Sequence, residues 1–125
     1  MKRILIAEDD FIVSKLYQMY FQRRGLQGSF FSTGTGVLES AKHQRPDLVI
    51  LDYELPDICG PEVMRELRKI PGCEGVPVIF VTSRATPEVT AQLRAEGARE
   101  VFGKPFPPAE FIRLIRELSG STGDI

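Results

Sequence analysis

The sequence contains no apolar run that approaches the roughly 20 residues needed to cross a bilayer. It has two cysteines and one histidine in 125 residues, and no Cys or His near Cys59 or Cys73 completes a zinc-binding spacing. Its 16 basic and 17 acidic residues give a net charge of −1, without a continuous basic stripe. We therefore expect neither a membrane nor a nucleic acid as a direct partner.

The scarcity of cysteine and histidine also limits the chemistry. The N-terminus carries no signal peptide, so the expected location is the reducing cytoplasm, where a disulfide between Cys59 and Cys73 is possible but disfavoured. His43 is the only histidine and falls late in an expected helix. We expect it at the surface, so that the chain does not itself carry phosphohistidine.

A chain of 125 residues fits one domain. It can bury roughly two-thirds of its unfolded surface, and it should therefore fold without disulfides or a structural metal. We expect the domain to cover residues 1–119. Residues 120–125 have linker composition, so we expect a flexible tail or the start of a linker there.

Five short apolar runs alternate with five segments of helical periodicity. The expected strands lie at residues 4–7, 29–31, 47–51, 78–81 and 100–102. Three of them are apolar on both sides, which indicates a mainly parallel sheet covered by helices on both faces. The sequence therefore predicts an α/β fold with a doubly wound, five-stranded parallel sheet.

Polar side chains follow four of these strands at the point where each strand ends. They are Glu8, Asp9, Asp10, Asp52, Thr82 and Lys104. Ligands of such sheets bind beyond the carboxyl ends of the strands, where the strand order reverses. We expect these side chains to meet in one crevice, except that Asp10 is better explained as the N-cap of the first helix.

Three carboxylates in one crevice would repel one another, and the pKa of at least one carboxyl group would rise. A divalent cation would relieve this repulsion. Oxygen ligands without Cys or His suit Mg²⁺, for which Mn²⁺ can substitute. We expect Asp9, Asp52 and one backbone carbonyl, with that of Glu54 as the candidate, to bind the metal directly.

An acidic metal site beside one amine and one hydroxyl matches the needs of phosphoryl transfer. Asp52 ends the central strand beside the metal and is the expected nucleophile. Lys104 would pair with one phosphoryl oxygen, and Thr82 would donate a hydrogen bond to another. Each residue alone has an ordinary structural explanation, so the hypothesis depends on all four strand ends carrying compatible groups.

At these residues the sequence resembles the receiver domain of two-component response regulators, of the single-domain kind used in chemotaxis and sporulation relays. The resemblance covers essentially the whole chain. The matching segments are Ile4-Leu5-Ile6-Ala7-Glu8-Asp9-Asp10, Asp47-Leu48-Val49-Ile50-Leu51-Asp52, Leu55-Pro56 with Gly60, Val81-Thr82-Ser83, Gly97-Ala98 and Lys104-Pro105-Phe106. The resemblance implies the flavodoxin-like (βα)5 receiver fold.

The resemblance also implies roles for single residues. Glu8 and Asp9 match the acidic pair, of which the second binds the metal directly and the first often acts through water. Asp52 matches the phosphoacceptor, Thr82 the switch hydroxyl and Lys104 the family's lysine, whose bond to Pro105 is expected to be cis.

The implied phosphodonor is a histidine kinase or a histidine phosphotransfer protein, and the implied output is a downstream effector protein. We expect a monomer or weak dimer that phosphorylates itself and slowly loses the phosphate, rather than a turnover enzyme.

Two departures from the family pattern lead to further expectations. Val101 stands where the family often has Tyr or Phe, and Phe102 should face the opposite side of the sheet and join the core. Glu54 and Arg84 each lie two positions after a site residue. We expect them to form an ion pair that partly screens the site and changes the lifetime of the phosphate.

Three other functions remain as alternatives. The main alternative is a receiver-like docking module that accepts no phosphate. Val101 supports this alternative, because the family often has Tyr or Phe at that position. A flavin carrier would need a Ser-, Thr- or Gly-rich loop after the first strand, where Glu8-Asp9-Asp10 would repel phosphate. An aspartyl phosphatase commonly has a second Asp where this chain has Glu54.

Overall fold

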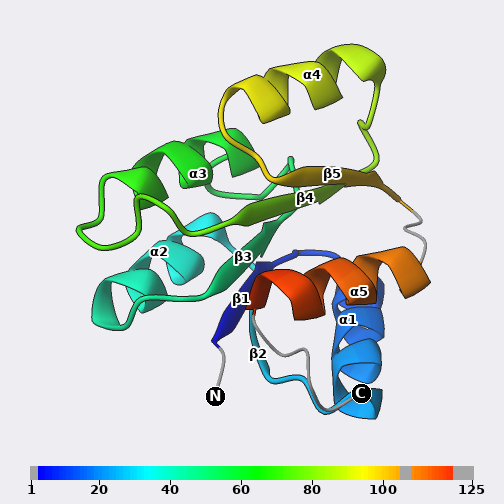
Figure 1. Ribbon diagram of the computed structural model, residues 1–125. Helices are drawn as coiled ribbons and strands as arrows, with labels where there is room; N and C mark the ends of the chain where they lie inside the picture. Colours follow the sequence, from blue (N-terminus) through cyan, green and yellow to red (C-terminus); the bar gives the residue numbers. More distant parts are fainter. Residues whose placement is uncertain (1–2, 105–107, 120–125) are drawn as a thin grey trace.

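The computed structural model describes residues 3–104 and 108–119, in which five strands and five helices alternate (Figure 1). The strands are β1 (Ile4–Ala7), β2 (Gly28–Phe31), β3 (Leu48–Leu51), β4 (Val78–Thr82) and β5 (Glu100–Gly103). The helices are α1 (Phe11–Arg23), α2 (Gly34–His43), α3 (Gly60–Arg68), α4 (Pro87–Ala95) and α5 (Pro108–Ser119). All strand pairs are parallel, in the order β2-β1-β3-β4-β5. The predicted doubly wound sheet is confirmed, and its strand order reverses between β1 and β3.

Helices cover both faces of the sheet (Figure 1). Every residue of β1, β3 and β4 is buried, and alternate side chains of these strands enter two separate cores. One core contains buried residues of α1 and α5, and the other contains buried residues of α2, α3 and α4. This arrangement explains why the central strands are apolar throughout their length.

Local signals place the helix ends. The side chain of Asp10 accepts hydrogen bonds from the backbone N–H groups of Ile12 and Val13, as an N-cap does. Thr86 caps α4 in the same way ahead of Pro87. Beyond α4, Gly97 has a φ of 114°, which only glycine adopts without strain. The expected cap at Asp10 is therefore confirmed, and Gly97 lies just past the end of α4.

The first and last helices pack against the same core. In α1 the buried residues are Tyr17 and Phe21, and Leu16 is 37% exposed. Phe11 and Ile12, in the first turn of α1, are each 72% exposed. In α5 the buried residues include Phe111, Ile112 and Ile115.

The fifth strand divides its side chains as predicted. Val101 packs against the core beneath α2, α3 and α4, and Phe102 packs against the opposite core. The Phe102 ring meets the ring of Phe111 edge-on, with centroids 5.6 Å apart. Phe102 is therefore a core residue.

Several smaller expectations can also be compared with the structure. Cys59 and Cys73 are free thiols, one exposed and one buried, and His43 is exposed at the end of α2. Among the described residues, no helix is long and apolar enough to span a bilayer. The expected cis bond at Pro105 and the expected tail at 120–125 lie outside the described residues.

Candidate functional site

Backbone hydrogen bonds fix the strand ends that carry the candidate residues. The N–H of Asp52 donates to the carbonyl of Ala7 at 3.2 Å, which sets the end of β3 beside that of β1. The N–H of Lys104 donates to the carbonyl of Thr82 at 3.0 Å. Since β4 lies between β3 and β5, the ends of four neighbouring strands are aligned at one edge of the sheet.

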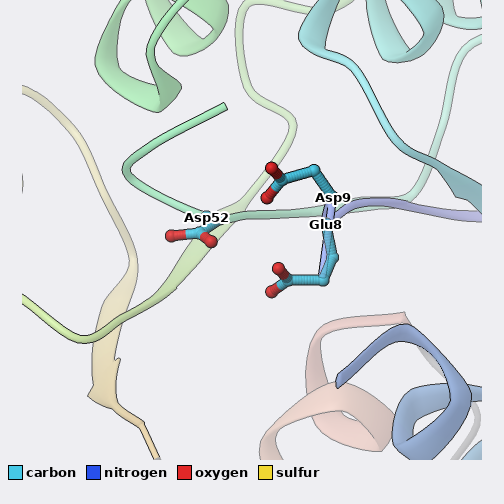
Figure 2. Close-up of side chains that lie close together, drawn as sticks. All are labelled: Glu8, Asp9 and Asp52. Atoms are coloured by element: carbon cyan, nitrogen blue, oxygen red, sulfur yellow. The ribbon is translucent and has the colours of Figure 1, made fainter. Parts of the chain in front are cut away.

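Three carboxylates converge at this edge. One oxygen from each of Glu8, Asp9 and Asp52 lies within 4.8 Å of the other two. Figure 2 shows Glu8 and Asp9 extending to opposite sides of the end of β1, with Asp52 beside them on β3. Glu8 and Asp52 are buried and Asp9 is exposed, so the cluster opens to solvent on the Asp9 side.

The chemistry of these donors fits a magnesium ion. All three are carboxylates, and one oxygen of each lies within 4.8 Å of the other two. Hard oxygen ligands around a partly open position are what Mg²⁺ prefers, because it keeps several of its waters. Asp9, Asp52 and, in part through water, Glu8 would hold the ion.

One amine neutralises part of this charge. Lys104 Nζ lies 2.8 Å from Asp52 Oδ2 and 2.8 Å from Glu8 Oε1. Burial alone would lower the pKa of Lys104, but its bonds to Asp52 and Glu8 outweigh that effect and raise the pKa. Lys104 therefore stays an ammonium group between the two carboxylates.

Glu8 shows the electrostatic cost that the sequence predicts. Burial raises the pKa of Glu8, and the nearby charge of Asp52 raises it further, while bonds from Lys104 and the Asp10 N–H act against this. The same charges act on Tyr17, which lies buried in α1. Burial raises the pKa of Tyr17 well above its ordinary value, with Glu8 and Asp52 adding to the effect. The rise was predicted for the cluster, but desolvation is its largest cause.

Thr82 is buried at the end of β4. Its hydroxyl oxygen accepts a hydrogen bond of 3.0 Å from the backbone N–H of Arg84. This bond connects the side chain of Thr82 to the loop that precedes α4. A movement of the hydroxyl group would therefore move the backbone of that loop.

The loop after β3 contacts the side chain of Asp52 directly. The N–H of Glu54 donates to Asp52 Oδ1 at 3.3 Å. The side chain of Glu54 forms the expected ion pair with Arg84, at 2.7 Å and with both side chains 58% exposed. At Gly60, a Cβ would collide with the carbonyl oxygen of Asp52. Glycine is therefore required where α3 begins against the end of β3.

The structure thus gathers Glu8, Asp9 and Asp52 within 4.8 Å of one another. Lys104 pairs with Glu8 and Asp52, and Thr82 lies at the end of the adjacent strand. Sequence reasoning missed two residues of this neighbourhood. Tyr17 is an ordinary apolar position in the helical pattern, and no local signal marks it as lying under the acidic cluster. Asp57 reads as a loop residue, yet its carboxylate binds the first turn of α2.

Comparison with known proteins agrees with this geometry. The family described as "Response regulator receiver domain" matches residues 4–116. The chain is 33% identical to the DNA-binding response regulator MtrA of Mycolicibacterium paratuberculosis over 92% of its length, but it spans only about half of that relative, 50%. It is 29% identical to the polar-differentiation response regulator DivK of Brucella anthropi, covering 95% of this chain and 97% of that protein.

A solved structure gives the same result. The receiver domain of the sensor histidine kinase PA1611 from Pseudomonas aeruginosa superposes with a TM-score of 0.86 at 26% identity, covering 95% of this chain and 98% of that one. That domain was crystallised with a magnesium ion coordinated in its active-site cleft. Receiver domains act as signalling switches rather than turnover enzymes. By its sequence, its strand order and its acidic strand ends, the chain belongs to the response regulator receiver domains of two-component signalling.

Proposed function

We propose that this receiver accepts a phosphoryl group on Asp52, with Mg²⁺ bound beside it, and thereby switches a surface that a downstream effector recognises. The observation that carries the proposal is the position of Lys104 Nζ, 2.8 Å from both Asp52 Oδ2 and Glu8 Oε1. An ammonium group held beside a carboxylate nucleophile and two further acids is what phosphoryl transfer to an aspartate requires.

The transfer needs little covalent chemistry from the protein. An oxygen of Asp52 attacks the phosphorus of a phosphohistidine, the P–O bond forms, and the P–N bond breaks with its electron pair left on the imidazole nitrogen. Mg²⁺, when bound by Asp9 and Asp52 and the candidate carbonyl of Glu54, would supply charge neutralisation for the phosphoryl oxygens. Mn²⁺ would substitute. Lys104 exchanges part of its contact with Asp52 for a phosphoryl oxygen.

The donor must bring its histidine to the open side of the cluster, and the surface there is suited to a protein. Phe11 and Ile12 are each 72% exposed, and Leu16 is 37% exposed. They occupy the first turns of α1, directly after the acidic residues. Exposed apolar patches beside a reactive group mark protein contact sites. The phosphodonor is therefore a histidine kinase or a histidine phosphotransfer protein that covers this end of α1.

The switch would start at Thr82. Its oxygen already accepts from the Arg84 N–H, which leaves the hydroxyl proton to donate to a phosphoryl oxygen. That bond would pull the loop before α4 toward the site. Within α4, Leu93 is the buried residue, so few contacts oppose a shift of this helix. The effector surface in this proposal is therefore α4 with the neighbouring β5. The proposal also places the chain in the cytoplasm, as a monomer or weak dimer.

Intact mass after incubation with Mg²⁺ and a small acyl-phosphate donor tests the proposal. The wild-type chain should gain one phosphoryl group only when Mg²⁺ is present, and Asp52→Asn should gain none. The gain should fade slowly after the donor is removed. If the wild type gains nothing from the acyl phosphate or from a phosphorylated histidine phosphotransfer protein, the chain is the docking module instead.

A further inference from the structure

The loop of residues 53–59, which joins the acceptor strand to α3, is attached to a helix that lies far away in the sequence. Asp57 Oδ1 accepts from the N–H of Gly34 at 2.9 Å, and Asp57 Oδ2 accepts from the N–H of Thr35 at 2.8 Å. The Thr35 hydroxyl donates to the same oxygen. One side chain of the loop thus takes three donors from the first turn of α2.

This contact is additional to the helix's own cap. The N-cap of α2 is Thr33, whose hydroxyl oxygen accepts from the N–H of Gly36 at 3.1 Å. Asp57 instead satisfies the two N–H groups that precede Gly36, and its negative charge lies at the positive end of the helix dipole. Slight burial raises the pKa of Asp57, but the bonds from Thr35 and Gly34 dominate and hold the pKa well below its usual range. The carboxylate therefore stays ionised at neutral pH.

Tight packing supports the same contact. A Cβ at Gly34 would collide with Cγ2 of Val63 in α3, and it would lie 3.0 Å from Cγ1 of Ile58 in the loop. The backbone of Gly34 at the start of α2 therefore packs directly against side chains of the loop and of α3. The loop cannot shift along α2 without breaking the Asp57 bonds.

The same loop is held at the acceptor. The N–H of Glu54 donates to Asp52 Oδ1 at 3.3 Å, and the N–H of Gly60 donates to the carbonyl of Tyr53 at 2.7 Å. The loop is thus fixed at its start by Asp52, at its end by Gly60 and in its middle by Asp57. Of these three attachments, only the middle one depends on a second helix.

We propose that Asp57 is a positioning residue of the acceptor site, which holds the loop against α2 so that the backbone of Glu54 stays aligned with Asp52. This inference rests on the proposed function, because the aligned groups matter only if Asp52 and the Glu54 carbonyl bind Mg²⁺. Through Asp57 the first turn of α2 is coupled to the metal site.

Calorimetric titration of Mg²⁺ into the phosphate-free full chain tests the coupling, with thermal unfolding measured on the same samples. Asp57→Asn should weaken Mg²⁺ binding about tenfold, the lower end of what loss of a residue that orients metal ligands costs. Thr35→Val keeps the charge of Asp57 and both backbone bonds, so a smaller loss is expected. Thr33→Ala removes the cap on Gly36 from the same helix turn without touching the loop, so it should lower stability and leave Mg²⁺ affinity unchanged.

Amide hydrogen exchange gives a second readout. Mg²⁺ should slow exchange at Gly34 and Thr35 in the wild type and in Thr33→Ala, but not in Asp57→Asn. The inference is overturned if Asp57→Asn binds Mg²⁺ as the wild type does, if Thr33→Ala loses as much affinity, or if the loss vanishes in high salt, which would indicate a simple charge effect. A wild type that binds no Mg²⁺ would overturn the proposed metal site itself, and the positioning role with it.

Discussion

Two cations lie near Asp52, the proposed acceptor, in ion pairs of almost equal length, and they differ in burial. Lys104 Nζ is 2.8 Å from Asp52 Oδ2 and Glu8 Oε1, with only 20% of the lysine side chain exposed. Arg84 Nε is 2.7 Å from Glu54 Oε2, with both side chains 58% exposed. Water screens the second pair and is largely excluded from the first. Although the distances are equal, the difference in burial predicts different roles. The buried amine of Lys104 should act on the transferred phosphoryl group, whereas the exposed Glu54–Arg84 pair should affect how easily water reaches the site.

Replacing each cation in turn should separate these roles most clearly. Lys104→Met should slow phosphoryl gain about 100-fold, because one fixed donor to the developing charge is lost from a partly desolvated site. Arg84→Met should change the rate only about twofold, since its charge lies in solvent. The time course of intact mass with Mg²⁺ and acyl phosphate measures both. Equal losses in the two variants would show that burial does not distinguish the pairs.

A second difference concerns the free energy of unfolding, which the buried carboxylate of Glu8 should lower and the exposed carboxylate of Glu54 should not. Burial raises the pKa of Glu8, so its ionised form is less favourable in the folded chain than in the unfolded one. Such a group stabilises the fold below its unfolded pKa, and that stability is lost as the pH rises through the folded pKa. In the absence of Mg²⁺, Glu8→Gln should therefore raise the free energy of unfolding by about 1 kcal/mol at pH 8.

Urea unfolding in EDTA at pH 4 and pH 8 measures this effect. The advantage of Glu8→Gln should shrink at pH 4, where the wild-type carboxyl is protonated, and again at pH 8 once Mg²⁺ is added. Glu54→Gln is the matched control, because Glu54 is exposed and should show no gain at either pH. A gain that is the same at both pH values would mean that Glu8 does not carry the cost of burial.

The residues at the strand ends, including both of these ion-pair groups, could be predicted from the sequence. The strand ends at Asp52 and Thr82 follow from apolar runs, and the cap at Asp10 follows from local chemistry, because each depends on a few neighbouring residues. The Glu54–Arg84 pair could be expected because both residues follow neighbouring strands by the same spacing. Such signals suffice wherever parallel strands bring residues to one edge.

Other contacts depend on how helices and strands pack against one another, and the sequence pattern does not reveal that arrangement. Asp57 meets α2 only because β1 lies between β2 and β3 in the sheet and α2 packs beside α3. Phe11 and Ile12 are exposed in the first turn of α1, although both have the composition of core residues. In each case the missing information is the placement of one element against another, which periodicity within an element does not contain.

The smallest expected effect is the mutual stabilisation of Glu54 and Arg84. A double-mutant cycle with Glu54→Ala and Arg84→Ala should give a coupling free energy below about 0.5 kcal/mol, and it should vanish in high salt.

The pair should nevertheless affect the lifetime of the phosphate, because its side chains span the loops on either side of the proposed acceptor and hinder the approach of water. Each single variant should shorten the phosphate lifetime about threefold, or about 0.6 kcal/mol of activation free energy. Decay of the phosphorylated mass after donor removal measures the lifetime, and the swapped pair Glu54→Arg with Arg84→Glu should restore it. An unchanged lifetime in Glu54→Ala would leave the exposed pair with neither a stabilising nor a screening role.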